Sequence, residues 1–541
     1  MESRSGRMSF LRAGAVPQPL IHRWYASPFL LAPHTGGLSF RNQLLPSLES
    51  YLADPELHAR AVADPDMYGA PYIDAGPAGP PGVEALLADT LVGARPRLDL
   101  ADAIDQALVL LDERATGSSL DSLYADVPEP LRGYVELVYD TAHRPHLRFF
   151  EALLYRGPAF EPDAQAVSFT ATPEIGQPFL YSSPILPRPG RLDISLPFAS
   201  EHWDALFAAR TEPVDVSELA ARFELGPEAL PLFTSLFTDV APAPHDTVEP
   251  GSVRTRYFGH ASVLVETSSS AVLLDPLIGY EGDGGPDHFT IADLPAKLDA
   301  VIISHAHPDH FSLEALLQLR GRTTNIIVPR SSGGSIQDPS LKMMLQALGF
   351  PRVYELGELE SLPAGPDMEV VALPFVGEHA DLDIRTKMVP MVRALGRTFL
   401  FATDVALPEP AFYDRLAEVV GEVDALFIGL ECVGAPLSWL YGSILRSLPT
   451  HQQNQSRRMI GSDASMADAL AVQTRARRVF VYAMGLESWL KNRTGGEFDP
   501  ESEQVRESGL LSKICEERGI SSELLYQKAE FQWPATEGRS R

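Results

Sequence analysis

Residues 304–310 read Ser-His-Ala-His-Pro-Asp-His and directly follow the apolar run 298–303, Leu-Asp-Ala-Val-Ile-Ile. The apolar run predicts a buried strand. Because alternate residues of an extended segment point the same way, His305 and His307 project together. The proline then turns the chain, so the Asp and the His that follow it offer a second pair of ligands across the bend. The whole chain has 14 histidines, so this concentration of imidazoles and carboxylate predicts a site for two metal ions.

The bulk composition excludes several classes of protein. The apolar content of 45% is ordinary for a globular protein, and 541 residues predict about two to four domains. A net charge of −28 argues against binding to nucleic acid or to an anionic membrane surface. No run approaches the roughly 18 apolar residues of a membrane span, and no apolar signal region follows the N-terminus. Two cysteines exclude a disulfide framework, so we expect a cytoplasmic protein.

The first 245 residues differ in pattern from the rest. Helical periodicity is predicted at 99–114 and 130–156, between Pro- and Gly-rich stretches, and a strand is predicted at 191–196. The Pro-rich segment 241–251 is typical of a linker. We therefore predict an N-terminal mixed α+β domain over residues 1–245 and a second domain over residues 246–541.

The second domain begins with predicted strands at 254–266, 271–275 and 298–304. A helix is expected to follow Ser312, which is a suitable N-cap. Strands then alternate with helices to about residue 482. This order predicts an α/β fold in which two sheets pack face to face with helices outside, an αββα sandwich.

The His-x-His-x-Asp-His pattern, with the upstream segments 259–261 and 274–275, resembles the metallo-β-lactamase superfamily over residues 252 to 490. That superfamily includes hydrolases, nucleases and oxygenases, so the remaining ligands must decide the reaction. The resemblance implies a third ligand after the predicted strand at 369–372, where the chain offers both Glu378 and His379. It also implies a bridging carboxylate at Asp404. A hydrolase usually has one further His after the last core strand, and here that strand ends without one.

The chemistry of this set favours iron. With Glu378, the predicted ligands are three imidazoles and three carboxylates: His305, His307, Asp309, His310, Glu378 and Asp404. Zinc hydrolases favour nitrogen-rich, four-coordinate sites. Mixed imidazole and carboxylate sites with open positions suit non-haem iron and oxygen chemistry.

The same residues and the order of the two domains resemble the di-iron β-hydroxylase family of nonribosomal peptide and chloramphenicol pathways. The resemblance implies two non-haem Fe ions, O₂ as co-substrate and an external electron donor. It implies hydroxylation at the β-carbon of an aminoacyl group held as a thioester on a carrier domain of a nonribosomal peptide synthetase. It further implies an electron-donating reductase as a partner, and a homodimer whose N-terminal domain mediates dimerisation and helps form the substrate channel.

Four further residues are expected near the metals. Glu431 ends a predicted strand, His379 is a candidate to orient a ligand carboxylate, and His260 follows a strand near the pocket; these three are the candidate catalytic residues. Asp275 is expected to fix the motif loop by hydrogen bonds. The alternative function is a dinuclear zinc hydrolase acting on a phosphodiester, lactone or thioester, and the choice between Glu378 and His379 discriminates the two.

Overall fold

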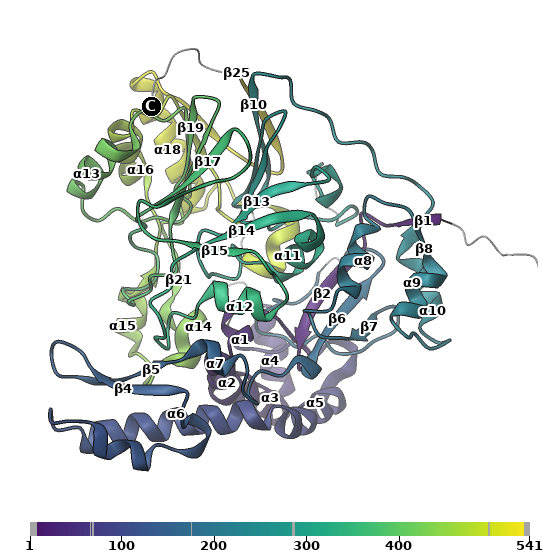
Figure 1. Ribbon diagram of the computed structural model, residues 1–541, viewed down its shortest axis with the longest axis vertical. Helices are drawn as coiled ribbons and strands as arrows, with labels where there is room; N and C mark the ends of the chain where they lie inside the picture. The colour runs from purple at the N-terminus through teal and green to yellow at the C-terminus, as the bar shows by residue number, and fades with distance from the viewer. Residues whose placement is uncertain are drawn as a thin grey trace, which may run out of the picture.

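The C-terminal half of the protein consists of two seven-stranded sheets packed face to face (Figure 1). The computed structural model describes residues 8–64, 67, 70–174, 176–283, 287–495 and 498–534. The first sheet, in spatial order, contains β15 (Val353–Leu356), β14 (Thr323–Pro329), β13 (Leu298–Ile302), β12 (Ala271–Leu274), β11 (Ser262–Glu266), β10 (Ser252–Gly259) and β25 (Ala529–Pro534). The second contains β16 (Ser361–Pro363), β17 (Met368–Leu373), β18 (Val389–Ala394), β19 (Arg397–Phe401), β20 (Ala425–Ile428), β23 (Arg478–Val481) and β24 (Ser521–Leu524).

Apolar side chains from both sheets form the core between them. Val263 and Ile302 of the first sheet pack in one cluster with Phe399, Phe427 and Phe480 of the second. The outer face of the second sheet is covered by α13 (Ala411–Val420), α16 (Ala464–Gln473) and α18 (Glu503–Glu517). The first sheet is covered by α11 (Leu313–Leu319), α12 (Leu341–Ala347) and the N-terminal part of the chain. The predicted α/β class and αββα sandwich are confirmed.

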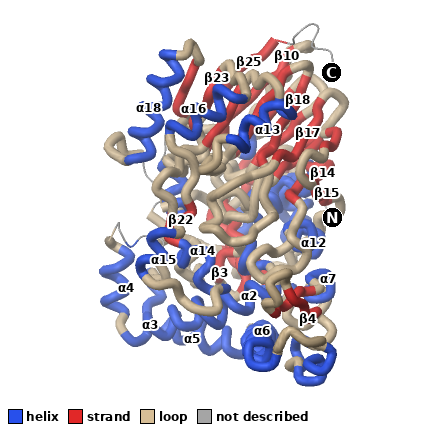
Figure 2. The backbone as a smooth tube through the Cα atoms, turned by 90° about the vertical axis from the view of Figure 1, so that its left-hand side faces the viewer, coloured by secondary structure: helices blue, strands red, loops and turns tan. Residues whose placement is uncertain are grey.

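The N-terminal part combines helices with small sheets, and its helices form the lower layer in Figure 2. The helices of this layer are α1 (Pro28–Leu31), α2 (Pro33–Ser39), α3 (Leu45–Ala53), α4 (Pro55–Val62), α5 (Gly79–Gly93) and α6 (Arg95–Arg114). A second group of helices is α8 (His202–Ala208), α9 (Val216–Arg222) and α10 (Leu230–Ser235). A four-stranded sheet has the order β3 (Trp24–Tyr25), β2 (Val16–Ile21), β6 (Gln165–Thr170) and β7 (Leu192–Ser195). A three-stranded sheet has the order β8 (Val214–Asp215), β1 (Met8–Leu11) and β9 (Phe237–Thr238). Across the described ranges, none of the helices combines the length and apolar character needed to cross a membrane.

Two predicted elements in this chain turn out differently. The helix expected at 99–114 is confirmed within α6, but the helix expected at 130–156 is wrong. That segment forms the hairpin β4 (Val135–Tyr139) and β5 (Pro145–Phe149), followed by the short α7 (Glu151–Leu154). The Asp140 carboxylate accepts hydrogen bonds from the N–H groups of Ala142 and Arg144, both at 2.8 Å, and so stabilises a turn instead of a helix.

The strand expected at 254–266 is two strands joined by a tight turn. β10 and β11 pair antiparallel, and the turn holds Gly259 at φ +107° and His260 at φ +49°. Nearly all residues of both strands are buried, and the turn between them is so short that the two strands follow one another almost without interruption in the sequence. The turn brings His260 to the same edge of the sandwich as the histidine motif.

That edge is where the carboxyl ends of the parallel strands meet. β13 lies between β12 and β14 and is parallel to both, so residues 304–310 leave the sheet at this edge. Ser312 caps α11 by accepting from the N–H of Ala315 at 3.3 Å, as predicted. In the second sheet β19, β20 and β23 are likewise parallel, and the loops after them open on the same edge. Loops at the carboxyl ends of parallel strands are the usual place for a site in such folds.

A buried ion pair of the C-terminal half is hydrogen-bonded to a tyrosine of the N-terminal half. The Glu314 carboxylate on α11 accepts from Arg493 Nη2 at 2.7 Å and from the Tyr25 hydroxyl, on β3, at 3.0 Å. The Arg493 and Glu314 side chains are 8% and 2% exposed. Arg493 Nη1 also donates to the Tyr25 hydroxyl at 2.8 Å. The bonds of Tyr25 to Glu314 and Arg493 therefore form only while the two halves are in contact.

Replacing Arg493 by Met is expected to destabilise the protein strongly, because it leaves the Glu314 carboxylate buried without its cation. The expected loss is about 3–5 kcal/mol, measured as a fall in the urea midpoint. The control is Arg330→Met, which breaks an ion pair with Glu360 whose side chains are 55% and 46% exposed. That change is expected to shift the urea midpoint little, because water screens an exposed ion pair. Equal shifts in the two variants would contradict this account.

Candidate metal centre

The six predicted ligands meet at the shared edge of the two sheets. Four follow β13, Glu378 follows β17, and Asp404 follows β19. Their side chains fall into overlapping groups in which the potential ligand atoms all lie within 4.8 Å of one another. The groups are His305, His307 and Glu378; His305, His310 and Asp404; and His260, Asp309 and His310. Each of the six predicted ligands belongs to at least one group.

The distances place the carboxylates between the imidazoles. Glu378 Oε1 lies 2.7 Å from His307 Nδ1, and Glu378 Oε2 lies 3.8 Å from His305 Nε2. Asp404 Oδ2 lies 2.8 Å from His310 Nε2 and 3.7 Å from His305 Nε2. Asp404 is therefore in a position to bridge two cations, one on each side.

The polar atoms that face this centre suit a metal. Among the described residues, the buried atoms around this centre without a hydrogen-bond partner include His305 Nε2, His310 Nε2, Glu378 Oε2 and Asp404 Oδ1, and also His260 Nε2 and His379 Nε2. Buried polar atoms are nearly always hydrogen-bonded, so unsatisfied lone pairs that converge on one point indicate a cation site. The mixed nitrogen and oxygen set fits non-haem iron.

Asp275 orients one of the imidazoles. Its carboxylate accepts from the Ser304 N–H at 2.7 Å and lies 3.0 Å from His310 Nδ1. Because a carboxylate accepts, Nδ1 of His310 carries a proton, and Nε2, which faces Asp404, is the nitrogen that a cation would bind in place of a proton. The expectation that Asp275 fixes the motif loop is confirmed.

Tyr441 contacts a second imidazole, and no sequence pattern indicated this contact. Its hydroxyl lies 2.8 Å from His307 Nε2, and 134 residues separate the two in the chain. With Nε2 engaged by the hydroxyl, Nδ1 of His307 is directed to Glu378. Tyr441 ends α14 (Leu437–Tyr441) and packs edge-on against Phe29 of α1, at 5.6 Å between ring centroids. The N-terminal part of the chain thus supports the centre through this ring.

His379 lies beside the centre but belongs to none of the three groups. Its ring stacks on His307 at 4.6 Å between centroids. Its Nδ1 lies 3.2 Å from the Gly377 carbonyl oxygen and 3.0 Å from Glu378 Oε2. The ring therefore contacts a predicted ligand carboxylate from outside.

Glu431 follows β20 and is also outside the three groups. Its Oε1 accepts from the Gly434 N–H at 3.2 Å and from Gln504 Nε2 at 3.0 Å. Burial raises the pKa of this carboxyl group. These bonds hold the loop after β20 against α18.

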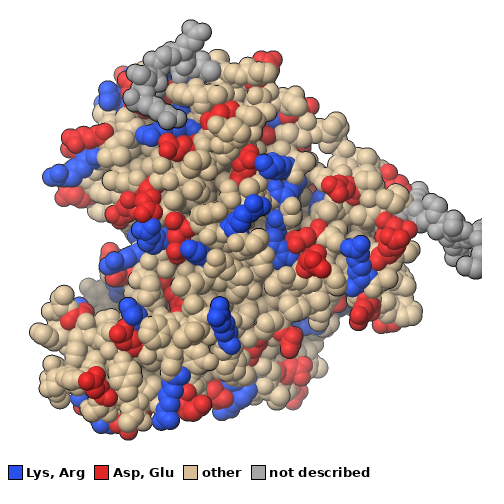
Figure 3. All heavy atoms as spheres, in the orientation of Figure 1, with Lys and Arg blue, Asp and Glu red and all other residues tan. Residues whose placement is uncertain are grey.

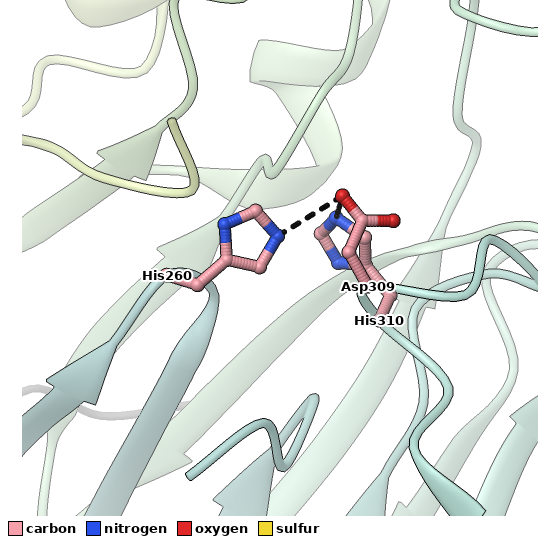
Figure 4. Close-up of side chains that lie close together, drawn as sticks. All are labelled: His260, Asp309 and His310. Carbon is pink, nitrogen blue, oxygen red and sulfur yellow. Dashed lines mark ion pairs between the residues drawn. The ribbon is translucent and has the colours of Figure 1, made fainter. Parts of the chain in front are cut away.

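His260 is the third candidate catalytic residue, and the structure brings it to the metal centre. Figure 4 shows its ring directed from the β10–β11 turn towards the carboxylate of Asp309. The distance from His260 Nε2 to Asp309 Oδ2 is 3.3 Å.

Burial and the charges of neighbouring side chains shift the pKa values of the ionisable groups in this centre. Burial raises the pKa of Glu378 to about 7. Burial and the neighbouring His310 hold the pKa of His305 well below its ordinary value. Burial opposes protonation of His310, but the charges of Asp404 and Asp309 raise its pKa well above the ordinary value. Cations that bind here displace the protons that these groups share.

Several non-glycine residues around the centre have left-handed backbones: His260 (φ +49°), Asp275 (+37°), Glu378 (+64°) and Thr403 (+40°). Such conformations cost on the order of 1–3 kcal/mol each and cluster at functional sites. Here they occur where each strand ends and a side chain must turn inwards. The surrounding fold stabilises this geometry.

Comparison with known proteins gives a family in which such a metal centre is expected. A profile of the diiron non-heme β-hydroxylase N-terminal domain matches residues 10–242, and a β-lactamase superfamily profile matches residues 270–480. A 4-amino-L-phenylalanyl-[CmlP-peptidyl-carrier-protein] 3-hydroxylase from Streptomyces venezuelae is 36% identical over 529 residues, which is 95% of this chain and 98% of that protein. The chain belongs to the diiron non-heme β-hydroxylase family.

Solved structures support the assignment over the whole chain. The crystal structure of CmlA, a diiron β-hydroxylase from Streptomyces venezuelae, matches with a TM-score of 0.91 and 34% identity, covering 97% of this chain and 100% of that one. A variant of CmlA matches with a TM-score of 0.87, also at 34% identity, covering 97% of this chain and 99% of that one. The protein is therefore a di-iron oxygenase, as predicted, and the zinc hydrolase alternative is not favoured.

Replacing Asp275 by Asn is expected to weaken iron binding about 10- to 100-fold, because the amide no longer holds the Nδ1 proton of His310. Iron content after dialysis against graded chelator measures the effect. The control is Asp367→Asn, since Asp367 also accepts from the Thr267 and Ser269 hydroxyls, at 2.9 and 2.8 Å, but does so away from the centre. The same iron loss in both variants would show that Asp275 has no specific role.

Proposed function

We propose that this di-iron enzyme hydroxylates the β-carbon of an aminoacyl group held as a thioester on a carrier domain of a nonribosomal peptide synthetase. The observation that carries the proposal is the 36% identity, across both halves of the chain, to a hydroxylase of a carrier-bound 4-amino-L-phenylalanyl group. The deeply buried centre supports it, because C–H hydroxylation needs a site that excludes water.

The six predicted ligands, which are the grouped residues other than His260, are proposed to bind two iron ions. His305, His307 and Glu378 would hold one ion, Asp309 and His310 would hold the other, and Asp404 would be shared between them. Support for Glu378 over His379 comes from the grouping, since Glu378 shares a group with two imidazoles and His379 shares none. When bound, such a centre supplies O₂ activation and the insertion of one oxygen atom into a C–H bond.

The remaining candidates act through the ligands. His379 is proposed to orient Glu378, because its Nδ1 lies 3.0 Å from Oε2 of that carboxylate. Tyr441 fixes the ring of His307, and Asp275 fixes the ring of His310. Glu431 is proposed to act outside the ligand set by holding the loop next to Asp404.

The N-terminal residues 1–245 are proposed to form one side of the substrate channel and to mediate a homodimer, with residues 246–541 as the catalytic domain. The hydroxyl of Tyr181 supports the first role, since it donates to the Pro308 carbonyl within the histidine motif at 3.0 Å.

An electron-donating reductase is proposed as a second partner, and the cytoplasm is proposed as the compartment of the reaction. On the face in Figure 3, basic and acidic side chains are interspersed, and the outline is hollowed on its left side.

Glu378→Ala is expected to lower the iron content or abolish the reaction of the reduced centre with O₂, because a ligand carboxylate is lost. His379→Ala is the matched neighbour and is expected to keep two irons per chain. Iron analysis and optical spectra of both variants, purified side by side, decide between them. Normal iron and O₂ reactivity in Glu378→Ala, with loss of both in His379→Ala, would reverse the ligand assignment.

The reaction itself is tested with a series of aminoacyl-loaded carrier domains, O₂ and a chemical reductant. We expect the iron-loaded enzyme to add one oxygen atom to the aminoacyl group of at least one loaded carrier, and the zinc-loaded enzyme to add none. Mass spectrometry of the released phosphopantetheine ion measures the product. Hydrolysis of the thioester by the zinc form, without oxygen insertion by the iron form, would overturn the proposal.

A further inference from the structure

We infer that His260 is a positioning residue that donates a hydrogen bond from Nε2 to the Asp309 carboxylate and does not itself bind metal. The inference rests on the proposed role of Asp309 as an iron ligand. His260, Asp309 and His310 form a group with the dimensions of a metal site (Figure 4). Distance alone therefore does not show whether His260 binds a metal ion or donates a hydrogen bond to a residue that does.

The backbone fixes where the His260 ring can lie. The residue is 2% exposed and has a left-handed backbone, at φ +49°, in the β10–β11 turn. Its carbonyl oxygen accepts from the Ala483 N–H, after β23, at 2.9 Å. The turn of the first sheet is thereby joined to the end of a strand in the second. The ring is held beside His310, at 5.0 Å between centroids.

A backbone N–H then decides which ring nitrogen carries the proton. The Gly485 N–H donates to His260 Nδ1 at 3.1 Å. A nitrogen that accepts a hydrogen bond has no proton, and a neutral imidazole has one N–H. The proton is therefore on Nε2, which lies 3.3 Å from Asp309 Oδ2, slightly beyond the ordinary hydrogen-bonding range. Nε2 has no other hydrogen-bond partner among the described residues, so Asp309 is the acceptor nearest to it.

The same bond argues against metal ligation by His260. To bind a cation through Nε2, the ring must move its proton to Nδ1. The proton there would face the Gly485 N–H, so two donors would oppose each other in a buried site, and an unsatisfied buried donor costs about 1–3 kcal/mol. The structure thus favours His260 as a donor to a ligand over His260 as a ligand.

Asp309 is the ligand that most needs such a donor. Its side chain is 31% exposed, whereas those of the other proposed ligands are between 0% and 9% exposed. Within the described ranges, its nearest charged partners are His260 at 3.3 Å and His310 Nε2 at 3.9 Å, and the second is itself a proposed ligand. A hydrogen bond to Oδ2 restricts the rotation of the carboxylate and holds that oxygen 3.9 Å from His310 Nε2.

Two substitutions of His260 separate this role from a structural one. In Gln, the side-chain N–H₂ reaches the place of Nε2 and keeps the donor to Asp309, but the acceptor for Gly485 is lost. In Asn, the side-chain oxygen takes the place of Nδ1 and keeps the acceptor for Gly485, but the donor to Asp309 is lost. The positioning role predicts that Gln preserves the centre better than Asn, and a structural role through Gly485 predicts the reverse.

Iron content, Mössbauer spectra and thermal midpoints of the two variants are measured together. We expect His260→Asn to keep two irons and the wild-type midpoint, to change the Mössbauer parameters of one iron, and to lower turnover about 10- to 100-fold. His260→Gln is expected to retain the wild-type spectrum. Loss of one iron from both variants would identify His260 as a ligand, and unchanged spectra in both would remove any role at the centre.

A direct measurement does not depend on how either variant folds. Nitrogen-15 NMR of the wild-type protein, labelled at histidine and loaded with zinc, is expected to show His260 with a protonated Nε2 and an unprotonated Nδ1. The opposite assignment would overturn the inference. Because this readout requires no turnover, its failure is distinguishable from failure of the proposed hydroxylation, which the loaded-carrier assay tests separately.

Discussion

The desolvation of ionisable groups is the constraint on which this structure depends. The metal centre gathers imidazoles and carboxylates in a place where their side chains are almost fully buried, apart from Asp309. An isolated charge in such a place is very costly, so each group needs a partner of opposite character. These partners are present because acidic and basic side chains alternate in the centre. Asp404 lies against His310, and Glu378 lies against His307. The remaining lone pairs face inwards, where bound cations complete the compensation.

The residues that contact the ligand imidazoles from outside the centre also satisfy buried polar atoms. Each imidazole has two nitrogens, and a buried ring must satisfy both of them. For His310 the outer nitrogen is satisfied by Asp275, and for His307 it is satisfied by the Tyr441 hydroxyl. These partners come from a strand end and from a helix that packs on the N-terminal part. The geometry of the centre is therefore set by packing well away from the metals, which explains why the N-terminal part and the sandwich form one continuous interior.

The sandwich and the four ligands of residues 305–310 could be predicted because their signals are local or periodic, whereas Glu378 and Asp404 were expected only because the chain resembles a known family. A buried strand followed by closely spaced histidines is visible without knowledge of the fold. The β4–β5 hairpin was missed because the 130–156 segment has apolar spacing that also suits a helix, and the turn at Asp140 decides between the two. The contact of Tyr441 with His307 could not be predicted, because it depends on where a distant helix packs. The β10–β11 turn was missed because it is very short, so that segment 254–266 has the pattern of one continuous strand.

His260 shows why proximity alone is a poor guide to the role of a residue at a metal centre. Judged by distance, it belongs with Asp309 and His310 as well as any proposed ligand belongs with its neighbours. The difference lies in what the second ring nitrogen contacts. An acceptor behind the ring, such as Asp275 behind His310, leaves the inner nitrogen with a lone pair for a cation. A donor behind the ring, such as the Gly485 N–H behind His260, leaves the inner nitrogen with a proton for a carboxylate. The backbone at the end of β23 therefore distinguishes a ligand from an orienting group, although both are histidines at the same edge of the sandwich.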